Sequence, residues 1–170
     1  MASRLHALEA PWIHVAEASP SQLTEWTWMR AGEDDRAVVR ELRGRKMRSW
    51  PALFDEVAAA LQFPHFFQDN LAGLNDCMRD LSWLPGLRYL LVVSDAAELL
   101  REVAPEDLSV FLFLLHDVAR GWARPAAAQG RAGTGERPFH VILHEHGPRI
   151  ATLETRVLQA GVLVDRLPLT

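Results

Sequence analysis

The sequence of 170 residues has a single cysteine, no long apolar run and none of the common catalytic motifs. Cys77 stands alone, which excludes an internal disulfide and any zinc site built from several cysteines. The longest apolar stretch, Leu108 to Leu115, is interrupted by Ser109 and is far shorter than a membrane span. Phosphate-binding glycine loops, nucleophile elbows and metalloprotease helices are all missing. We therefore expect a protein without enzymatic activity, cofactor or membrane segment.

The N-terminus also lacks the features of a secretion signal. Glu9, Pro11 and His14 interrupt the apolar core that such a signal requires. Hydrophobic residues make up 49% of the chain and charged residues 24%, an ordinary globular balance that argues against extended disorder. The length suffices for one sizeable core. We expect a cytoplasmic protein that folds on its own and is monomeric when free.

Charge is distributed unevenly along the chain, although the formal net charge is only -4. From Arg36 to Pro51 there are six basic residues and one acidic residue, whereas from Asp69 to Asp117 there are nine acidic and three basic residues. The acidic middle suits a basic partner, although solvated helix faces would produce the same count. No aromatic platform accompanies the basic run, so we interpret it as a solvated strand edge and not as a nucleic-acid site.

Apolar periodicity predicts strands and helices that alternate along the chain. Strands are predicted at 12–18, 37–42, 87–93, 138–144 and 162–165, and helices at 21–30, 50–63, 69–81, 95–103, 107–122 and 149–160. Ser19 and Pro20 are typical of a helix start, and Gly161 of a helix end. Arg124 to Arg137 is rich in alanine, glycine and proline and is predicted to be a flexible connection. The alternation indicates an α/β fold with a largely parallel sheet.

The predicted helix at 69–81 has two chemically different sides, and we expect Asp69 to cap its start. Its apolar side, which should face the core, consists of Leu71, Leu74, Cys77, Met78 and Leu81. Its opposite side, which should face solvent or a partner, consists of Asp69, Ala72, Asp76 and Asp80, flanked by Asn75 and Arg79. Since Cys77 lies on the apolar side, we interpret it as a core residue and not as a nucleophile.

Three histidines near the end of the chain are candidate metal ligands. His140, His144 and His146 fall on one side of an extended strand. However, they lie at the end of that strand, and the sequence offers no second ligand group beside them. We therefore expect no metal site.

Between Val38 and Leu143 several unlike features occur in a fixed order. They are the helix of Ala52-Leu53-Phe54-Asp55-Glu56, its stop at Leu61-Gln62-Phe63-Pro64, the aromatic pair Phe66-Phe67, Asn70-Leu71 at the next helix start, Asp76-Cys77 within that helix, Trp83-Leu84-Pro85, and the strand Pro138-Phe139-His140-Val141-Ile142-Leu143. In these features the chain resembles the barstar family. The resemblance implies a three-layer α/β fold, with a short, largely parallel sheet and helices packed around it. We place the barstar-like domain at 36–146, between a strand–helix extension at 1–35 and a helix–strand extension at 147–170.

The resemblance also implies a function. Barstar-like proteins bind the active-site cleft of an extracellular ribonuclease, where carboxylates on an acidic helix take the place of RNA phosphates. We therefore expect an inhibitor of a basic extracellular ribonuclease or a related toxin, without direct contact to nucleic acid. The alternatives are an immunity or regulatory binding protein for a different partner, and an enzyme or nucleic-acid binder.

The family pattern assigns roles to particular positions of this sequence. Asp76 matches the central helix aspartate, Phe66 the contacting aromatic residue, Asn70 the asparagine at the helix start and Asp117 an acid of the fourth helix. The expected partner-binding residues are Phe66, Asn70, Asn75, Asp76, Arg79, Asp80 and Asp117. The chain departs from the pattern where Ala72 replaces an acid and Asn75 replaces a tryptophan, and Arg79 adds a positive charge. These departures favour a target other than barnase.

Overall fold

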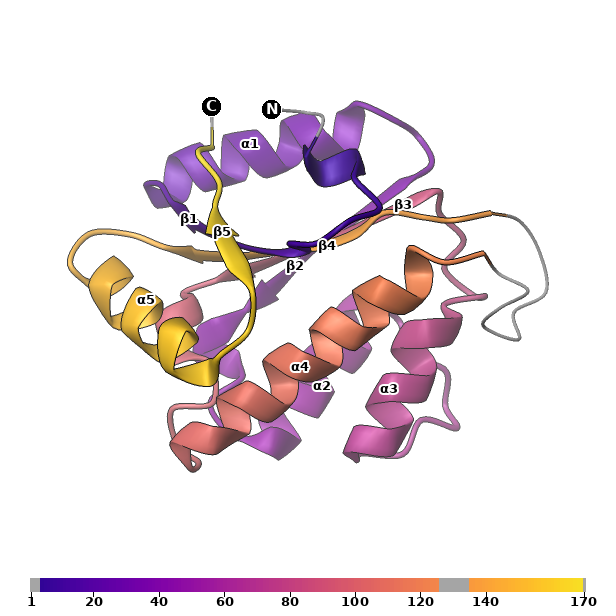
Figure 1. The fold of residues 1–170 in the computed structure, drawn as a ribbon. Coiled ribbons are helices and arrows are strands. Elements are labelled where there is room, and N and C mark those ends of the chain that lie inside the picture. The colour runs from indigo at the N-terminus through magenta and orange to yellow at the C-terminus, as the bar shows by residue number, and fades with distance from the viewer. Residues whose placement is uncertain (1–3, 126–134, 170) are drawn as a thin grey trace.

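A five-stranded parallel sheet forms the centre of the computed structural model, which describes residues 4–125 and 135–169 (Figure 1). The strands are β1 (Ile13–Glu17), β2 (Ala37–Arg43), β3 (Arg88–Ser94), β4 (Phe139–Glu145) and β5 (Val164–Arg166). They lie in the order β2-β3-β4-β1-β5, and all four pairings are parallel. The predicted α/β class with a largely parallel sheet is confirmed.

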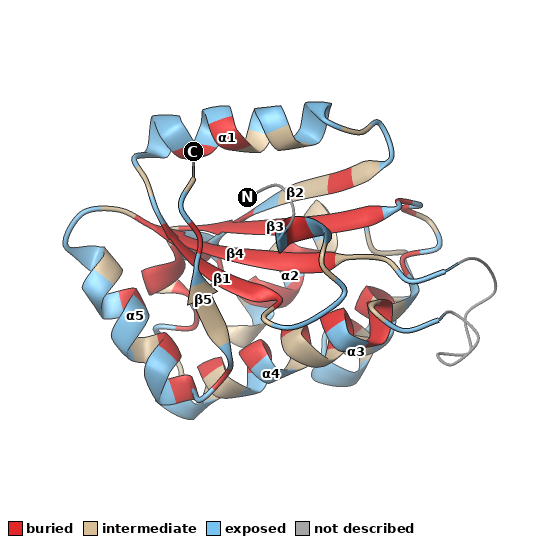
Figure 2. Cartoon of the chain, turned by 45° about the horizontal axis from the view of Figure 1, so that its top comes forward, coloured by how far each residue is buried: buried red, intermediate tan, exposed pale blue. Residues whose placement is uncertain are grey.

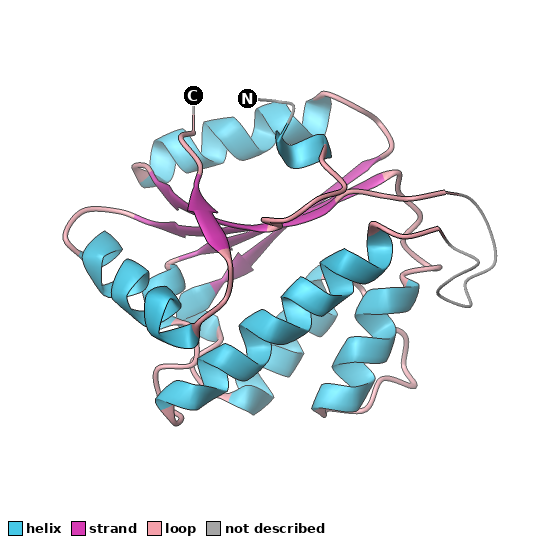
Figure 3. Cartoon of the chain, viewed as in Figure 1, coloured by secondary structure: helices cyan, strands magenta, loops and turns pink. Residues whose placement is uncertain are grey.

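Helices cover both faces of this sheet (Figures 1 and 3). They are α1 (Pro20–Gly32), α2 (Trp50–Ala60), α3 (Leu71–Asp80), α4 (Pro105–Trp122) and α5 (Arg149–Ala160), with short 3-10 helices η1 (Arg4–His6), η2 (Gly44–Lys46) and η3 (Ala96–Glu98). Helix α1 lies on one face, and α2 to α5 lie on the other. Within the described residues, none of these helices combines the length and the apolar character of a membrane span. The result is a three-layer arrangement.

Local sequence signals account for several element boundaries. The Ser19 side chain accepts a hydrogen bond from the Gln22 amide, and the Gln22 side chain accepts one from the Ser19 amide, a capping box in front of Pro20. Helix α5 ends at Gly161, whose φ of +73° is favourable for glycine. Both predicted boundaries are confirmed. Of the predicted flexible connection, residues 126–134 lie outside the described part of the chain.

The central strands are buried on both faces, as Figure 2 shows for β1, β3 and β4. In β4, Phe139, Val141 and Leu143 join the large apolar cluster under α2 to α5. Ile142 points the other way, into a smaller cluster under α1 that also contains Leu23. Burial on both faces explains why such strands are continuous apolar runs in the sequence.

The terminal segments supply two of the five strands. β1 pairs with β4 through Ile13 and Val141, and β5 pairs with β1 through Ile13 and Val164. β5 therefore forms one edge of the sheet, and β2 forms the other.

The predicted helix at 95–103 is wrong, because only the short η3 forms there. Asp95 and Leu100 have φ angles of +49° and +52°, which an α-helix does not permit. The amides of Leu100 and Glu102 donate to the carbonyl groups of Met47 and Arg48 instead of to their own helix. Hydrogen bonds to a distant segment therefore override the local helical periodicity.

Candidate partner-binding surface

Helix α3 separates its apolar and acidic residues onto different sides. Leu74, Cys77 and Met78 are buried against the core, whereas Asp76 and Asp80 are exposed. The predicted outward position of Asp76 is therefore confirmed. Leu71, predicted to face the core, is 37% exposed in the first turn, and that prediction is wrong.

Asn70, and not the predicted Asp69, caps the start of α3. The Asn70 side-chain oxygen accepts a hydrogen bond from the Gly73 amide at 2.8 Å, and the Asn70 backbone is extended, as a cap residue requires. Asp69 is consequently left exposed one residue before the cap. The expected site residue Asn70 thus positions the helix that carries the other candidates.

The loop before α3 lies directly against the first turn of the helix. A Cβ atom at Gly73 would overlap the Gln68 carbonyl oxygen, so only glycine permits this approach. The same carbonyl accepts a hydrogen bond from the Asn70 amide at 2.7 Å. The loop is therefore packed directly on the first turn of the helix.

The two aromatic residues of this loop face opposite ways. The Phe67 ring packs edge-on against Phe54 and Phe63, with ring centroids 6.4 and 4.9 Å away. Trp83 belongs to the same cluster, because its ring contacts Phe63. Its indole N–H donates a hydrogen bond to the Leu61 carbonyl at 2.9 Å. Phe66, in contrast, is 65% exposed. Phe67 therefore anchors the loop, and Phe66 is available to a partner.

The carboxylates on and just before α3 differ from most other acids of the acidic segment in forming no ion pair within the described residues. Within residues 4–125 and 135–169, no ion pair includes Asp69, Asp76 or Asp80. Arginines neutralise other acids of this segment, namely Asp95, Glu98, Glu102 and Asp117. Asp69, Asp76 and Asp80 thus form one group of described acids without ion pairs at α3, and Glu106 and Asp107 form another at the start of α4.

The remaining candidates surround these carboxylates to different degrees. Asn75 and Arg79 are half-buried on α3, and the Arg79 side chain donates to Asn75 Oδ1 at 2.9 Å. Asp117 lies on α4, with a side chain that is 46% exposed and paired with Arg120 at 2.8 Å. Helices α3 and α4 contact each other, and the Trp122 indole donates to the Met78 carbonyl. No hydrogen bond or ion pair between described residues connects Asp117 with the α3 carboxylates.

Cys77 has the environment of a core residue, as predicted. Its side chain is buried and forms no disulfide. Burial raises the pKa of the thiol, and the nearby carboxylates of Asp76 and Asp80 raise it further. The reactive thiolate is therefore disfavoured at this position.

The predicted strand edge at the basic run is confirmed, because β2 forms one edge of the sheet. Arg43 makes two hydrogen bonds to the Glu56 carboxylate, which hold the pKa of Glu56 below its usual range although partial burial opposes this. Arg45 pairs with Asp95 at 3.0 Å. These arginines are thus engaged within the protein.

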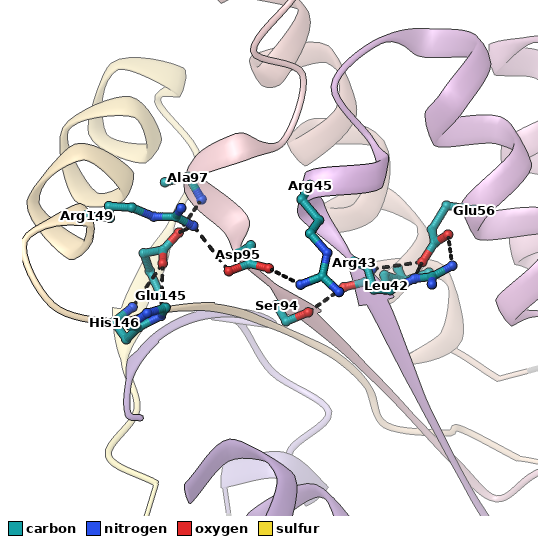
Figure 4. A network of polar contacts seen from close by, with 10 residues as sticks. All are labelled: Leu42, Arg43, Arg45, Glu56, Ser94, Asp95, Ala97, Glu145, His146 and Arg149. Carbon is teal, nitrogen blue, oxygen red and sulfur yellow. Dashed lines mark hydrogen bonds and ion pairs between the residues drawn. The ribbon is translucent and has the colours of Figure 1, made fainter. Parts of the chain in front are cut away.

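A second polar cluster lies where the parallel strands end (Figure 4). The buried Glu145 carboxylate accepts hydrogen bonds from Arg149 and from the amides of Ala97 and His146. Burial favours the protonated acid, but these hydrogen bonds outweigh it and lower the pKa of Glu145. Asp95 lies between Arg149 and Arg45, at 3.2 and 3.0 Å. No spacing in the sequence predicts this cluster, because Asp95 and Glu145 come from the ends of different strands.

The three candidate histidines, His140, His144 and His146, belong to two separate environments. His140 is fully buried, with its Nδ1 atom 2.9 Å from Nε2 of His14, which in turn contacts Asp165. The rings of His144 and His146 stack with centroids 6.3 Å apart, beside the second polar cluster.

Comparisons with known proteins identify a family and a shared fold. Residues 37–144 match the family model described as Barstar (barnase inhibitor). The ADP form of the Aeropyrum pernix ORC2 protein superposes with a TM-score of 0.59 at 10% identity, covering 95% of this chain and 43% of that one. The ADPNP-ADP complexes of the same protein give 0.50 at 12% identity, covering 92% and 41%.

The chain thus spans about two fifths of the length of these structures. At identities this low, the superposition shows that the fold is similar and nothing more. No match was found among the curated proteins.

Proposed function

The chain belongs to the barstar (barnase inhibitor) family, and we propose that it binds and blocks the active site of a small, basic, secreted ribonuclease or a related toxin. The family consists of inhibitors and not of enzymes. One observation carries the proposal: the exposed carboxylates of α3 have no cationic partner among the described residues, while arginines neutralise Glu98, Glu102 and Asp117 of the same acidic segment.

A ribonuclease cleft must concentrate arginine and lysine to hold RNA phosphates. Carboxylates on a rigid helix fit such a cleft because they form charge-assisted hydrogen bonds with these cations and attract them over a distance. Asp76 and Asp80 are four residues apart, so they lie on one side of α3, separated by about 6 Å along its axis. They are the proposed phosphate mimics.

Other residues of the surface support these carboxylates in different ways. Phe66 offers an exposed aromatic ring of the kind that anchors interfaces, held in place by the packing of Phe67. Asn75 and Arg79 form a hydrogen-bonded pair that can meet an acceptor on the rim of the cleft. Asp117 contributes less, because Arg120 already neutralises it.

Depletion of ribonuclease activity from the secreted proteins of the source organism tests the proposal. The immobilised protein should remove a small basic enzyme that cleaves RNA, and an Asp76→Asn column should remove much less of it. A Glu25→Gln column is the control, because Glu25 is an exposed acid on α1, across the sheet from α3. If no RNA-cleaving activity is depleted, the proposed function is wrong. If all three columns deplete it equally, the protein binds the enzyme through a surface other than α3.

A further inference from the structure

The polar cluster at the strand ends contains groups that ligate metal ions. One ligand atom each from Asp95, Glu145 and His146 lies within 4.8 Å of the other two (Figure 4). They follow or end the neighbouring parallel strands β3 and β4. The carboxyl edge of a parallel sheet is where α/β folds usually bind their ligands.

His144 provides an independent observation beside this cluster. It lines a pocket of about 130 Å³ together with Asp95 and His146, and only 2% of it is exposed. Its Nε2 atom lies 2.9 Å from the Ala18 carbonyl oxygen, which can only accept, so Nε2 carries the proton. Nδ1 is therefore unprotonated and offers a free lone pair, and it is buried without a hydrogen-bond partner. The pocket beside the cluster therefore contains a second imidazole whose lone pair has no donor.

His146 repeats part of this pattern. Its Nδ1 atom is also buried without a hydrogen-bond partner, and it lies 3.4 Å from Oε1 of Glu145. Two neighbouring ligands of a tetrahedral ion with bonds of about 2.1 Å are separated by about 3.4 Å. The pair therefore has the spacing of two metal ligands.

We propose that Asp95, Glu145 and His146 form a binding site for one divalent transition-metal ion of the zinc type, with His144 beside it. This differs from the expectation from the sequence, which was that the histidines bind no metal. Imidazole and carboxylate ligands suit such an ion, whereas the oxygen-only sets that calcium and magnesium prefer are not present in this cluster. The site is separate from the α3 surface and connects the ends of β3 and β4. A bound ion therefore stabilises the folded chain.

Two arginines compete with the ion for the carboxylates. Arg149 bonds Oε2 of Glu145 and Oδ1 of Asp95, and Arg45 bonds Oδ2 of Asp95. The Arg45 and Arg149 side chains are 62% and 44% exposed, so both can move into solvent when an ion arrives. Oε1 of Glu145, which faces His146, has no arginine bound to it. Removal of Arg45 should consequently strengthen metal binding.

Titration of the chelator-treated full-length chain with Co²⁺, followed by absorption spectroscopy, and with Zn²⁺, followed by calorimetry, tests the site. We expect one ion per chain, tetrahedral Co²⁺ bands and a higher unfolding temperature with Zn²⁺. His146→Ala and Asp95→Asn should each weaken binding by about a hundredfold or more. Arg45→Gln should bind more tightly than the parent, because the competing cation is gone.

The variants are chosen so that folding is preserved. The His146 side chain is 43% exposed, and asparagine tolerates the left-handed backbone of position 95. His65→Ala removes an exposed histidine far from the cluster in sequence and should bind as the parent does. The site does not exist if no single saturable ion is bound. It is equally excluded if His146→Ala and Asp95→Asn bind like the parent, or if His65→Ala weakens binding as much as they do.

Discussion

At the scale of single residues, neighbouring positions of α3 contribute separately to partner binding and to the stability of the fold. Asp76 is exposed, and Leu74, two residues earlier, is fully buried in the core. Helical geometry produces this separation, because residues two apart point to different sides. Substitutions at these two positions should therefore have independent effects.

We expect Asp76→Ala to weaken binding of the captured ribonuclease by at least about 2 kcal/mol, mainly through faster dissociation. The reason is that the cations of the cleft would be left buried without a partner. Its unfolding temperature should stay near that of the parent. Leu74→Ala should instead lower the free energy of unfolding by roughly 2 to 5 kcal/mol through loss of packing. Calorimetry of binding and urea denaturation measure both effects, and unchanged affinity of Asp76→Ala would place the interface elsewhere.

His140 makes the stability of the fold depend on pH. Burial lowers the pKa of its imidazole from 6.5 to about 4, with His14 and His6 acting in the same direction and Asp165 and the Ala7 carbonyl opposing. The folded-state pKa lies below that of the unfolded chain, so the folded state favours neutral His140. The free energy of unfolding that depends on this neutral form is fully present above pH 6.5. It is lost as the pH falls from 6.5 to 4, by about 3 kcal/mol in total.

Urea denaturation between pH 7 and pH 4 checks this effect. The parent should lose about 3 kcal/mol more than His140→Gln over this interval. His65→Gln, at an exposed position, should follow the parent. Equal losses in the parent and in His140→Gln would show that another group causes the acid sensitivity.

At the scale of elements, α3 and the loop before it act as one unit. Gly73 allows the Gln68 carbonyl to lie against the first turn, and Asn70 caps the same turn. The exposed Phe66 belongs to the loop and Asp76 to the helix. Their relative position therefore depends on this contact.

Gly73→Ala should displace the loop, because the new methyl group overlaps a backbone oxygen. We expect a loss of about 1 to 3 kcal/mol in the free energy of unfolding and weaker binding of the ribonuclease. Gly32→Ala is the matched control, since a Cβ at this helix position meets no atom within 4 Å and alanine favours helices. Denaturation and binding measurements on both variants decide whether the contact matters, and equal behaviour would show that it does not.

At the scale of the whole molecule, the net charge of -4 hides a separation of paired and unpaired charge. The arginines at the end of β2 and after it are neutralised by Glu56, Asp95, Glu98 and Glu102. The carboxylates of α3 have no such partners among the described residues. This surface should therefore attract a basic protein before contact.

We expect the association rate with the ribonuclease to fall steeply as salt is added, because screening weakens this attraction. Stopped-flow mixing at low and high ionic strength measures the dependence. The double variant Asp76→Asn/Asp80→Asn should reduce the slope more than Glu25→Gln combined with Glu17→Gln, two exposed acids away from α3. An association rate that does not change with salt concentration would indicate an apolar interface.

The sequence by itself determined the elements whose signals are local. The capping box at Ser19, the glycine end at Gly161 and the alternating strands follow from side chains within a few residues of one another. The family pattern consists of several motifs, each of which depends on short spacings. The outward position of Asp76 follows from helical spacing, and the structure confirms it. Even here, the capping residue of α3 was predicted one position too early.

Only the tertiary structure decided which segments meet. The strand order β2-β3-β4-β1-β5 and the missing helix at 95–103 both depend on hydrogen bonds between distant parts of the chain. The approach of Asp95 to Glu145 and His146 requires β3 and β4 to end side by side. Such contacts leave no periodic trace in the sequence, because the partners are separated by tens of residues and their energy appears only when the sheet has formed.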